Sequence, residues 1–268
     1  MRARFKALAT PLPVLPRVAL ALFLAAAQVA PRAAADINVA TSGTFAEAFH
    51  ELKPDLERAT EERVMTVATS IGAGEDSIPR RLARGEAIDV VIVADTVLQQ
   101  LIDEGLVLAD SRVDLVRSTI GIAVRAGAPK PDIGTVAALR QTLLAAKSIA
   151  YSGSVSGTYV STELFQKLGI ADQVAGKSRK IDRERVGAVV ARGDAELGFQ
   201  QLSELKPIAG IDVVGPLPAE VQKVSVFSAG VIARSPKVPA ARKLIAALAS
   251  PGAARAIALT GLEPIHAH

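Results

Sequence analysis

The chain has 268 residues, with 31 Lys and Arg against 27 Asp and Glu, three His and no Cys. The lack of Cys excludes disulfide scaffolds, thiolate metal sites, iron–sulfur clusters and thiol nucleophiles. The formal charge of +4 raises the question of a nucleic acid or an anionic membrane as partner. All five charged residues within positions 1–35 are basic, however, and the other residues carry a net charge of −1. The sequence therefore predicts no nucleic-acid partner.

The N-terminal segment has the order of parts found in a secretory signal peptide. A basic start precedes an apolar stretch from Val18 to Ala30, and small residues end the segment at Ala35. The apolar stretch is shorter than the roughly 20 residues that span a bilayer. We therefore expect cleavage near Ala35, export to the periplasm and no stable membrane anchor.

From residue 36 onward, short apolar runs alternate with helical periodicity, which is typical of βαβ units in a parallel sheet. In the first half of this region the pattern predicts strands over 37–40, 64–68, 88–94 and 118–125. Helices are expected to follow Ser42, to run from Ser77 to Gly85, and to run from Asp95 to Gly105.

The second half continues with the same alternation. The pattern predicts helices over 136–146, 158–168 and 183–192, strands over 149–151, 196–199 and 224–233, and closing helices over 238–249 and 251–259. The simplest topology has the chain crossing near residue 118 and returning near residue 224. This predicts an α/β protein of two lobes, one formed by 36–118 with 224–268 and the other by 119–223, with a ligand cleft between them.

Three of the predicted loops combine Gly with hydroxyl side chains at the start of a helix. They span 41–44, 69–77 and 152–158, where free backbone N–H groups and the positive end of the helix dipole favour an anion. Each loop taken alone is also an ordinary helix cap, but three together indicate a small anion held by neutral donors. The predicted binding residues in these loops are Ser42, Gly43, Gly74, Ser77, Ser154, Ser156 and Gly157.

A fourth group comprises Arg183 and Arg185 near a predicted helix start, with Gln200 and Gln201 after a predicted strand. From this group Arg183 and Gln201 are candidate ligand-binding residues, and Arg80 in the first turn after Ser77 is a further candidate. The planar guanidinium of Arg suits a carboxylate or an oxyanion, although each Arg also fits a solvated helix face. No spacing of the three His matches a metal site, and no loop matches a dinucleotide or phosphate-binding fingerprint. We therefore expect neither a metal nor a cofactor.

Several segments, taken in order, resemble the periplasmic substrate-binding proteins of the molybdate-binding type. They are 39–42, 88–95, 156–169, 190–199 and 250–254, and they span nearly the whole chain after the signal peptide. The resemblance implies the type 2 periplasmic binding fold and an inner-membrane ABC-type transporter as partner. In that family, two Ser hydroxyls, backbone amides and a Tyr hydroxyl bind an oxyanion.

Carried over to this chain, the resemblance implies Ser42 and Ser77 as the two hydroxyl donors and Ser156 as a backbone donor. A further backbone donor falls near Arg183, and the Tyr position is occupied by Gln201. Since an amide replaces the phenol and an Arg lies nearby, a carboxylate larger than molybdate would suit the changed donors better.

The segments 76–82, 199–205 and 215–220 resemble a divergent branch of the same fold that includes bacterial aconitate isomerase. That resemblance implies a cofactor-free allylic proton transfer between cis- and trans-aconitate, which needs one group that removes and returns a carbon-bound proton. The nearest candidates are Glu75, Asp76 and Tyr151. Two functions stay open at this point: a periplasmic solute-binding protein for a small anion, and an isomerase on the same fold.

Overall fold

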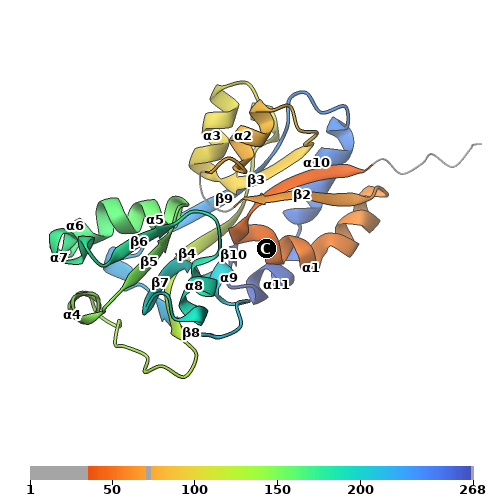
Figure 1. Ribbon diagram of the computed structural model, residues 1–268. Coiled ribbons are helices and arrows are strands. Elements are labelled where there is room, and N and C mark those ends of the chain that lie inside the picture. The colour runs from red at the N-terminus through yellow and green to blue at the C-terminus, as the bar shows by residue number, and fades with distance from the viewer. Residues whose placement is uncertain (1–35, 71–73, 267–268) are drawn as a thin grey trace, which may run out of the picture. The chain divides into compact units, whose positions relative to one another are not determined.

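The computed structural model describes residues 36–70 and 74–266. The predicted signal peptide lies outside the described residues. Ala34–His268 form one compact unit, and its elements are labelled in Figure 1. No helix within the described ranges is both long enough and apolar enough to cross a bilayer.

The first elements are three parallel strands, each followed by a helix. They are β1 (Ile37–Ser42), α1 (Gly43–Thr60), β2 (Val64–Ser70), α2 (Ile78–Ala83), β3 (Val90–Ala94) and α3 (Asp95–Asp103). Strand β1 lies between β2 and β3. The three predicted strands are confirmed, with ends that differ by about two residues. Helix α3 begins at Asp95, which is the predicted start, and Ala94 is its N-cap.

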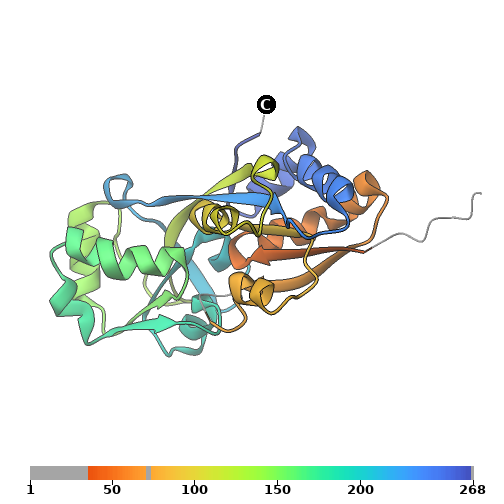
Figure 2. The same ribbon diagram turned by 90° about the horizontal axis from the view of Figure 1, so that it is seen from above.

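Strand β4 (Val113–Arg125) belongs to two groups of strands, as can be followed in Figure 2. Up to Thr119 it pairs antiparallel with β9 (Val224–Val231), which in turn pairs antiparallel with β3. From Ile120 onward β4 pairs with β7 (Leu197–Gln201) and β8 (Ile211–Pro216). The strand begins five residues before the predicted start, because the polar Asp114 and Arg117 interrupt the apolar pattern there.

The elements between β4 and β9 form the second group. They are α4 (Val136–Ala145), β5 (Ile149–Ser152), α5 (Val155–Tyr159), a π-helical turn (Val160–Leu164), α6 (Phe165–Lys167), α7 (Ala171–Ala175), β6 (Ser178–Ile181), α8 (Val186–Arg192) and α9 (Leu202–Leu205). Strand β5 is parallel to both β6 and β7. The helix predicted over 183–192 starts only at Val186, because Arg185 has an extended backbone.

The chain closes with α10 (Val238–Leu248), α11 (Pro251–Leu259) and the short β10 (Glu263–Pro264), which pairs with β4. Single turns of 3-10 helix lie at Ala109–Ser111 and Ala219–Val221. Strands β6 and β8 have no counterpart among the predicted strands. Strand β6 exposes two of its four residues, and no residue of β8 is fully buried, so neither has a long apolar run.

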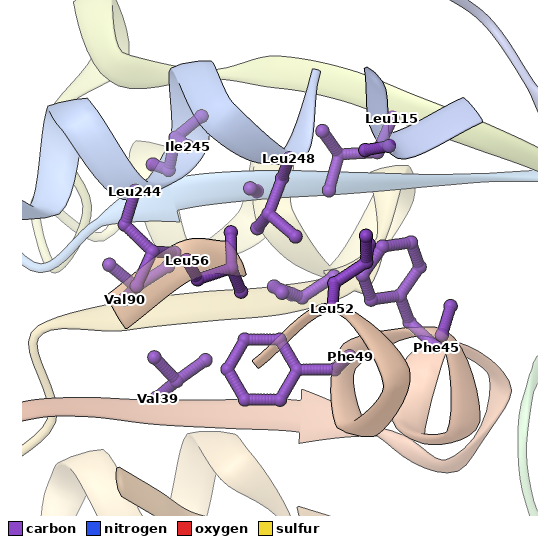
Figure 3. Packing of buried hydrophobic residues seen from close by; sticks show 14 of the residues in the cluster. Val39, Phe45, Phe49, Leu52, Leu56, Val90, Leu115, Leu244, Ile245 and Leu248 are labelled. Carbon is purple, nitrogen blue, oxygen red and sulfur yellow. The ribbon is translucent and has the colours of Figure 1, made fainter. Parts of the chain in front are cut away.

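Separate groups of buried side chains stabilise the two groups of strands. Figure 3 shows Phe45, Phe49 and Leu52 of α1 together with Leu244 and Leu248 of α10 in one cluster. The three α1 residues recur at helical spacing and turn one face of the helix to this core. A second cluster contains Ile120 and Ile122 of β4 with aromatic side chains from later elements, namely Tyr159, Phe165 and Phe199. The lobe boundaries at 118/119 and 223/224 stay a prediction.

Two pairs of parallel strands, β1 with β3 and β5 with β7, end beside the candidate site. Strands β1 and β3 end at Ser42 and Ala94, and strands β5 and β7 end at Ser152 and Gln201. Each is followed at once, or within three residues, by a helix. Ligands of open α/β sheets bind beyond such carboxyl ends, so this arrangement selects the region for closer description.

Candidate functional site

A cavity of about 270 Å³ lies beyond the carboxyl ends of these strands. Residues from the end of every one of the four strands, or from the helix that follows, contribute to its wall. The lining residues are Ser42, Gly43, Thr44, Ser77, Ile78, Pro79, Val93, Ala94, Val97, Gly153, Ser154, Val155, Thr158, Gln200, Glu204 and Phe227. The cavity therefore joins segments that lie up to 185 positions apart in the sequence.

The polar side chains of the cavity are almost all neutral. They comprise five hydroxyls, one amide and one carboxyl group, contributed by Ser42, Thr44, Ser77, Ser154, Thr158, Gln200 and Glu204. Within the described part of the chain, no Lys, Arg or His lines the cavity. The donors available to a ligand are therefore hydroxyls, an amide and backbone N–H groups.

Ser42 occupies the N-cap position of α1, a helix of 18 residues. Its backbone is extended, and its side chain makes no capping hydrogen bond. The Oγ is buried and has no hydrogen-bond partner among the described residues. A buried polar atom without a partner is costly, and this one lies at the positive end of a helix dipole in the cavity wall. The position is therefore suited to an anionic ligand that accepts a hydrogen bond from Ser42.

Glu204 of α9 brings a carboxyl group into the same cavity, and only 4% of the residue is exposed. Its Oε1 accepts a hydrogen bond from Gln200 Nε2 at 3.0 Å, and its Oε2 accepts one from Thr44 Oγ1 at 3.3 Å. A Cβ atom at Gly43 would overlap Glu204 Oε1. The missing side chain at the first residue of α1 thus gives the carboxyl group room beside the helix N-terminus.

Burial raises the pKa of Glu204 to about 7. The positive charge of Arg185 and the hydrogen bonds from Thr44 and Gln200 act in the opposite direction and only partly offset the loss of solvation. At neutral pH the protonated and the ionised forms of Glu204 are therefore both populated.

A chain of contacts connects Glu204 to the start of α8. The backbone N–H of Val186 donates to Gln200 Oε1 at 2.9 Å, so the Gln200 amide is held from both ends. Arg185, the residue before Val186, donates to Glu47 Oε1 of α1 at 3.2 Å. The guanidinium is thus paired with Glu47 while its charge still acts on Glu204.

Four of the predicted binding residues line the cavity. They are Ser42, Gly43, Ser77 and Ser154, and they come from three of the Gly- and hydroxyl-containing loops. Ser77 is the N-cap of α2, and Ser154 is the N-cap of α5, which begins three residues before the predicted start at 158. Both helices are short, with six and five residues, so α1 is the longest helix that starts at the cavity.

Three further predicted residues are buried beside the cavity and are used for internal contacts. Ser156 Oγ lies 2.9 Å from Ser152 Oγ, and Gly157 packs against the Ser152 backbone. Gln201 accepts a hydrogen bond from Ser118 Oγ at 2.8 Å. The Gln201 side chain therefore contacts β4, while its neighbour Gln200 lines the cavity.

The other predicted ligand-binding residues lie outside the cavity wall. Gly74 is exposed, and Arg80 is paired with Glu75 at 2.9 Å. Arg183 lines a separate charged hollow together with Asp182.

The three predicted proton-transfer groups also lie outside the cavity wall. Glu75 is paired with Arg80, and Asp76 lies 3.6 Å from the guanidinium of Arg81. The Tyr151 ring packs edge-on against Phe165, with 6.4 Å between the ring centres. In the described residues, no three His, Asp or Glu side chains form a group that could hold a metal ion.

Sequence reasoning missed Glu204 as a site residue. It lies four positions after Gln200, and this spacing allows the two side chains to meet. A sequence signal did exist: a charged residue stands between Leu202 and Leu205, directly after a fully buried strand. Such a residue is buried by its neighbours, and a buried carboxyl group is a functional-site candidate.

Comparison with known proteins places the chain in a family. Residues 37–263 match the family model described as bacterial extracellular solute-binding protein. The chain belongs to this family. The described fold agrees with this assignment, because solved structures of a molybdate-binding and a sulfate-binding protein share it.

Three relatives give the scale of the similarity. A protein named aconitate isomerase from a Pseudomonas species is 45% identical over 258 residues, covering 95% of this chain and 98% of that one. The periplasmic molybdate-binding protein of Azotobacter vinelandii has a TM-score of 0.68 at 19% identity, covering 84% and 98%. The sulfate-binding protein of Mycobacterium tuberculosis has a TM-score of 0.69 at 16% identity, covering 86% and 87%. The two structures establish the fold of this solute-binding protein.

Proposed function

We propose that the cavity of this solute-binding protein binds a small carboxylate anion, and that the protein interconverts cis- and trans-aconitate. The observation that supports anion binding is the buried Ser42 Oγ at the N-terminus of α1, which has no hydrogen-bond partner among the described residues. Neutral hydroxyl and amide donors at a helix N-terminus bind an anion without a cationic side chain.

The relative that is 45% identical over nearly the whole chain supports aconitate as the substrate. Its identity far exceeds that of the oxyanion-binding structures, which at 19% and 16% are informative about the fold only. Isomerisation also requires a group that exchanges a proton with carbon, and the cavity carries a carboxyl group for which simple anion binding has no use.

Delivery of a small anion to an inner-membrane ABC-type transporter is the second candidate function. The match to an extracellular solute-binding family over residues 37–263 favours it. In both functions the protein works in the periplasm after removal of the signal peptide near Ala35.

One pair of measurements separates the two functions. Purified protein without residues 1–35 is incubated with cis-aconitate and the ratio of isomers is followed by ¹H NMR, while calorimetry measures binding of trans-aconitate, molybdate, tungstate and sulfate. Enzymatic approach to the equilibrium ratio supports the isomerase. Tight molybdate binding together with an unchanged isomer ratio contradicts it and favours delivery.

Replacing Ser42 with alanine is expected to weaken aconitate binding by roughly ten- to hundred-fold, because a charge-assisted hydrogen bond from a buried donor is lost. The same change should leave the thermal midpoint nearly unchanged, since Ser42 Oγ bonds to none of the described residues. Calorimetric titration measures the affinity. Ser161→Ala is the control, because Ser161 Oγ bonds the Gly157 carbonyl and does not line the cavity. Equal affinities of the wild type and Ser42→Ala for aconitate would show that the anion does not bind at Ser42.

A further inference from the structure

We infer that the carboxylate of Glu204 removes a proton from the bound aconitate and returns it to a different carbon. This inference rests on the proposed isomerase function and names the acid–base group of that reaction. The sequence offered Glu75, Asp76 and Tyr151 for the role, but none of the three lines the cavity.

Glu204 lies on the wall of the cavity, where a base for this reaction has to lie. Apart from hydroxyl groups, Glu204 is the one titratable side chain that lines the cavity within the described ranges. A general base must come within hydrogen-bond distance of the proton that it abstracts, directly or through one water. Ser42 and Glu204 line the same cavity of about 270 Å³, so the carboxyl group borders the space in which a ligand held at Ser42 lies.

The carboxyl group is also held in a fixed place. Gln200 and Thr44 each donate to one of its oxygens, at 3.0 and 3.3 Å. Gly43 leaves space for Oε1 beside the first turn of α1, which a Cβ atom would fill. Catalytic groups are effective when they are held in the productive geometry before the substrate arrives. Glu204 is therefore built into the wall and does not depend on an exposed, mobile side chain.

The surroundings give this carboxyl group the properties of a base. Burial raises its pKa to about 7, so it is a stronger base than an ordinary Glu and is still partly ionised at neutral pH. Within the described residues, the charged group that acts on it is Arg185, the N-cap of α8, which is itself paired with Glu47 of α1. Strand β7 contributes the neutral amide of Gln200.

The step balances without a cofactor. A Glu204 oxygen takes a proton from the methylene carbon of aconitate: the C–H bond breaks, an O–H bond forms, and the electron pair is delocalised over the double bond and the adjoining carboxylate. The neutral Glu204 then returns the proton to the former vinylic carbon, and the double bond moves by one position. The hydroxyls around the cavity and the N-terminus of α1 stabilise the negative charge that develops on the substrate carboxylate.

Glu204→Gln tests the assignment, because the amide preserves the size of the side chain and removes the base. We expect turnover of cis-aconitate to fall by about 100- to 10,000-fold, while trans-aconitate still binds within a few-fold of the wild-type affinity. Incorporation of deuterium into the methylene group in D₂O, followed by ¹H NMR, should fall in parallel. Glu163→Gln is the matched control, since Glu163 is paired with Lys167 on the surface and does not line the cavity.

Each outcome has its own consequence. Absence of turnover by the wild type overturns the proposed reaction and the role of Glu204 with it, whereas equal turnover by the wild type and Glu204→Gln overturns the role of Glu204 alone. If Glu204→Gln does not bind trans-aconitate, Glu204→Asp decides, because it retains a carboxyl group that is displaced by one methylene. A lower kcat that still rises with pH then supports the assignment, and an unchanged kcat overturns it. Loss of turnover in Glu75→Gln or Tyr151→Phe, with Glu204→Gln active, also overturns it.

Discussion

The Glu204→Gln variant is expected to gain stability relative to the wild type as the pH rises from about 4.5 to 7. The wild-type carboxyl group has a pKa of about 7 in the folded protein against 4.5 as its ordinary value. In this interval the folded state keeps a proton that the unfolded state has released, so the free energy of unfolding of the wild type falls with rising pH. The decrease amounts to roughly 3 kcal/mol by pH 7, and it is absent from the variant.

Urea unfolding of both proteins at a series of pH values measures the effect. The difference between variant and wild type should grow by about 3 kcal/mol from pH 4.5 to 7 and stay constant above pH 7. Glu86→Gln is the control, because the hydrogen bond from Arg81 lowers the pKa of Glu86 below its ordinary value of 4.5. For this pair the wild type gains stability relative to the variant as the pH rises toward 4.5, and the difference should stay constant between pH 4.5 and 7. A difference for Glu204→Gln that does not vary with pH would show that folding does not raise the pKa of this carboxyl group.

Gly157→Ala is expected to lower the free energy of unfolding by about 3 kcal/mol, and the thermal midpoint by about 6 to 12 °C. Gly157 lies in α5, and its Cα packs against the backbone of Ser152 at the end of β5. A Cβ atom there would overlap the Ser152 carbonyl oxygen and lie 2.6 Å from the carbonyl carbon and 2.9 Å from the backbone nitrogen. Because all three atoms belong to the backbone, relief requires α5 to move away from β5.

Gly176→Ala is the matched control for this change. Gly176 follows α7 with φ of −71°, and a Cβ atom there has no neighbour within 4 Å. Alanine should therefore be neutral or stabilising by about 0.4 to 1 kcal/mol, because it restricts the unfolded chain. Thermal and urea unfolding should therefore show a loss of stability relative to the wild type for Gly157→Ala and no loss for Gly176→Ala. Similar midpoints for both would mean that the close approach of α5 to β5 is not required.

The sequence predicted the elements best where one periodic pattern ran without interruption. Helix α11 has the predicted bounds, and β3 has the continuous apolar run of a strand that is covered on both faces. Prediction was poorer where burial is uneven. Strand β6 pairs with β5 and strand β8 pairs with β4, and both have partly exposed side chains. Backbone pairing therefore determines these strands, and their sequences show no hydrophobic pattern that predicts them.

The residues of the candidate site also differ in how far the sequence alone predicts them. Ser42, Ser77 and Ser154 could be found from the sequence, because a hydroxyl residue before a helix is a local signal. For Glu204 the sequence held only its position between Leu202 and Leu205, because the environment of the carboxyl group depends on Thr44, which lies 160 positions away, and on the missing side chain at Gly43. The approach of α9 to the start of α1 turns an ordinary-looking Glu into a buried group with a raised pKa.

By itself, the sequence determined the alternation of strands and helices, the Gly- and hydroxyl-containing loops at helix starts, and the absence of Cys chemistry. All of these follow from neighbouring residues or from composition. Only the tertiary structure decided which side chains share the cavity. It brought the ends of β1, β3, β5 and β7 together, and it separated Gln200, which lines the cavity, from Gln201, which bonds to Ser118 of β4. The physical reason is that adjacent residues of a strand face opposite sides of a sheet, and only the packed sheet determines which side meets the ligand.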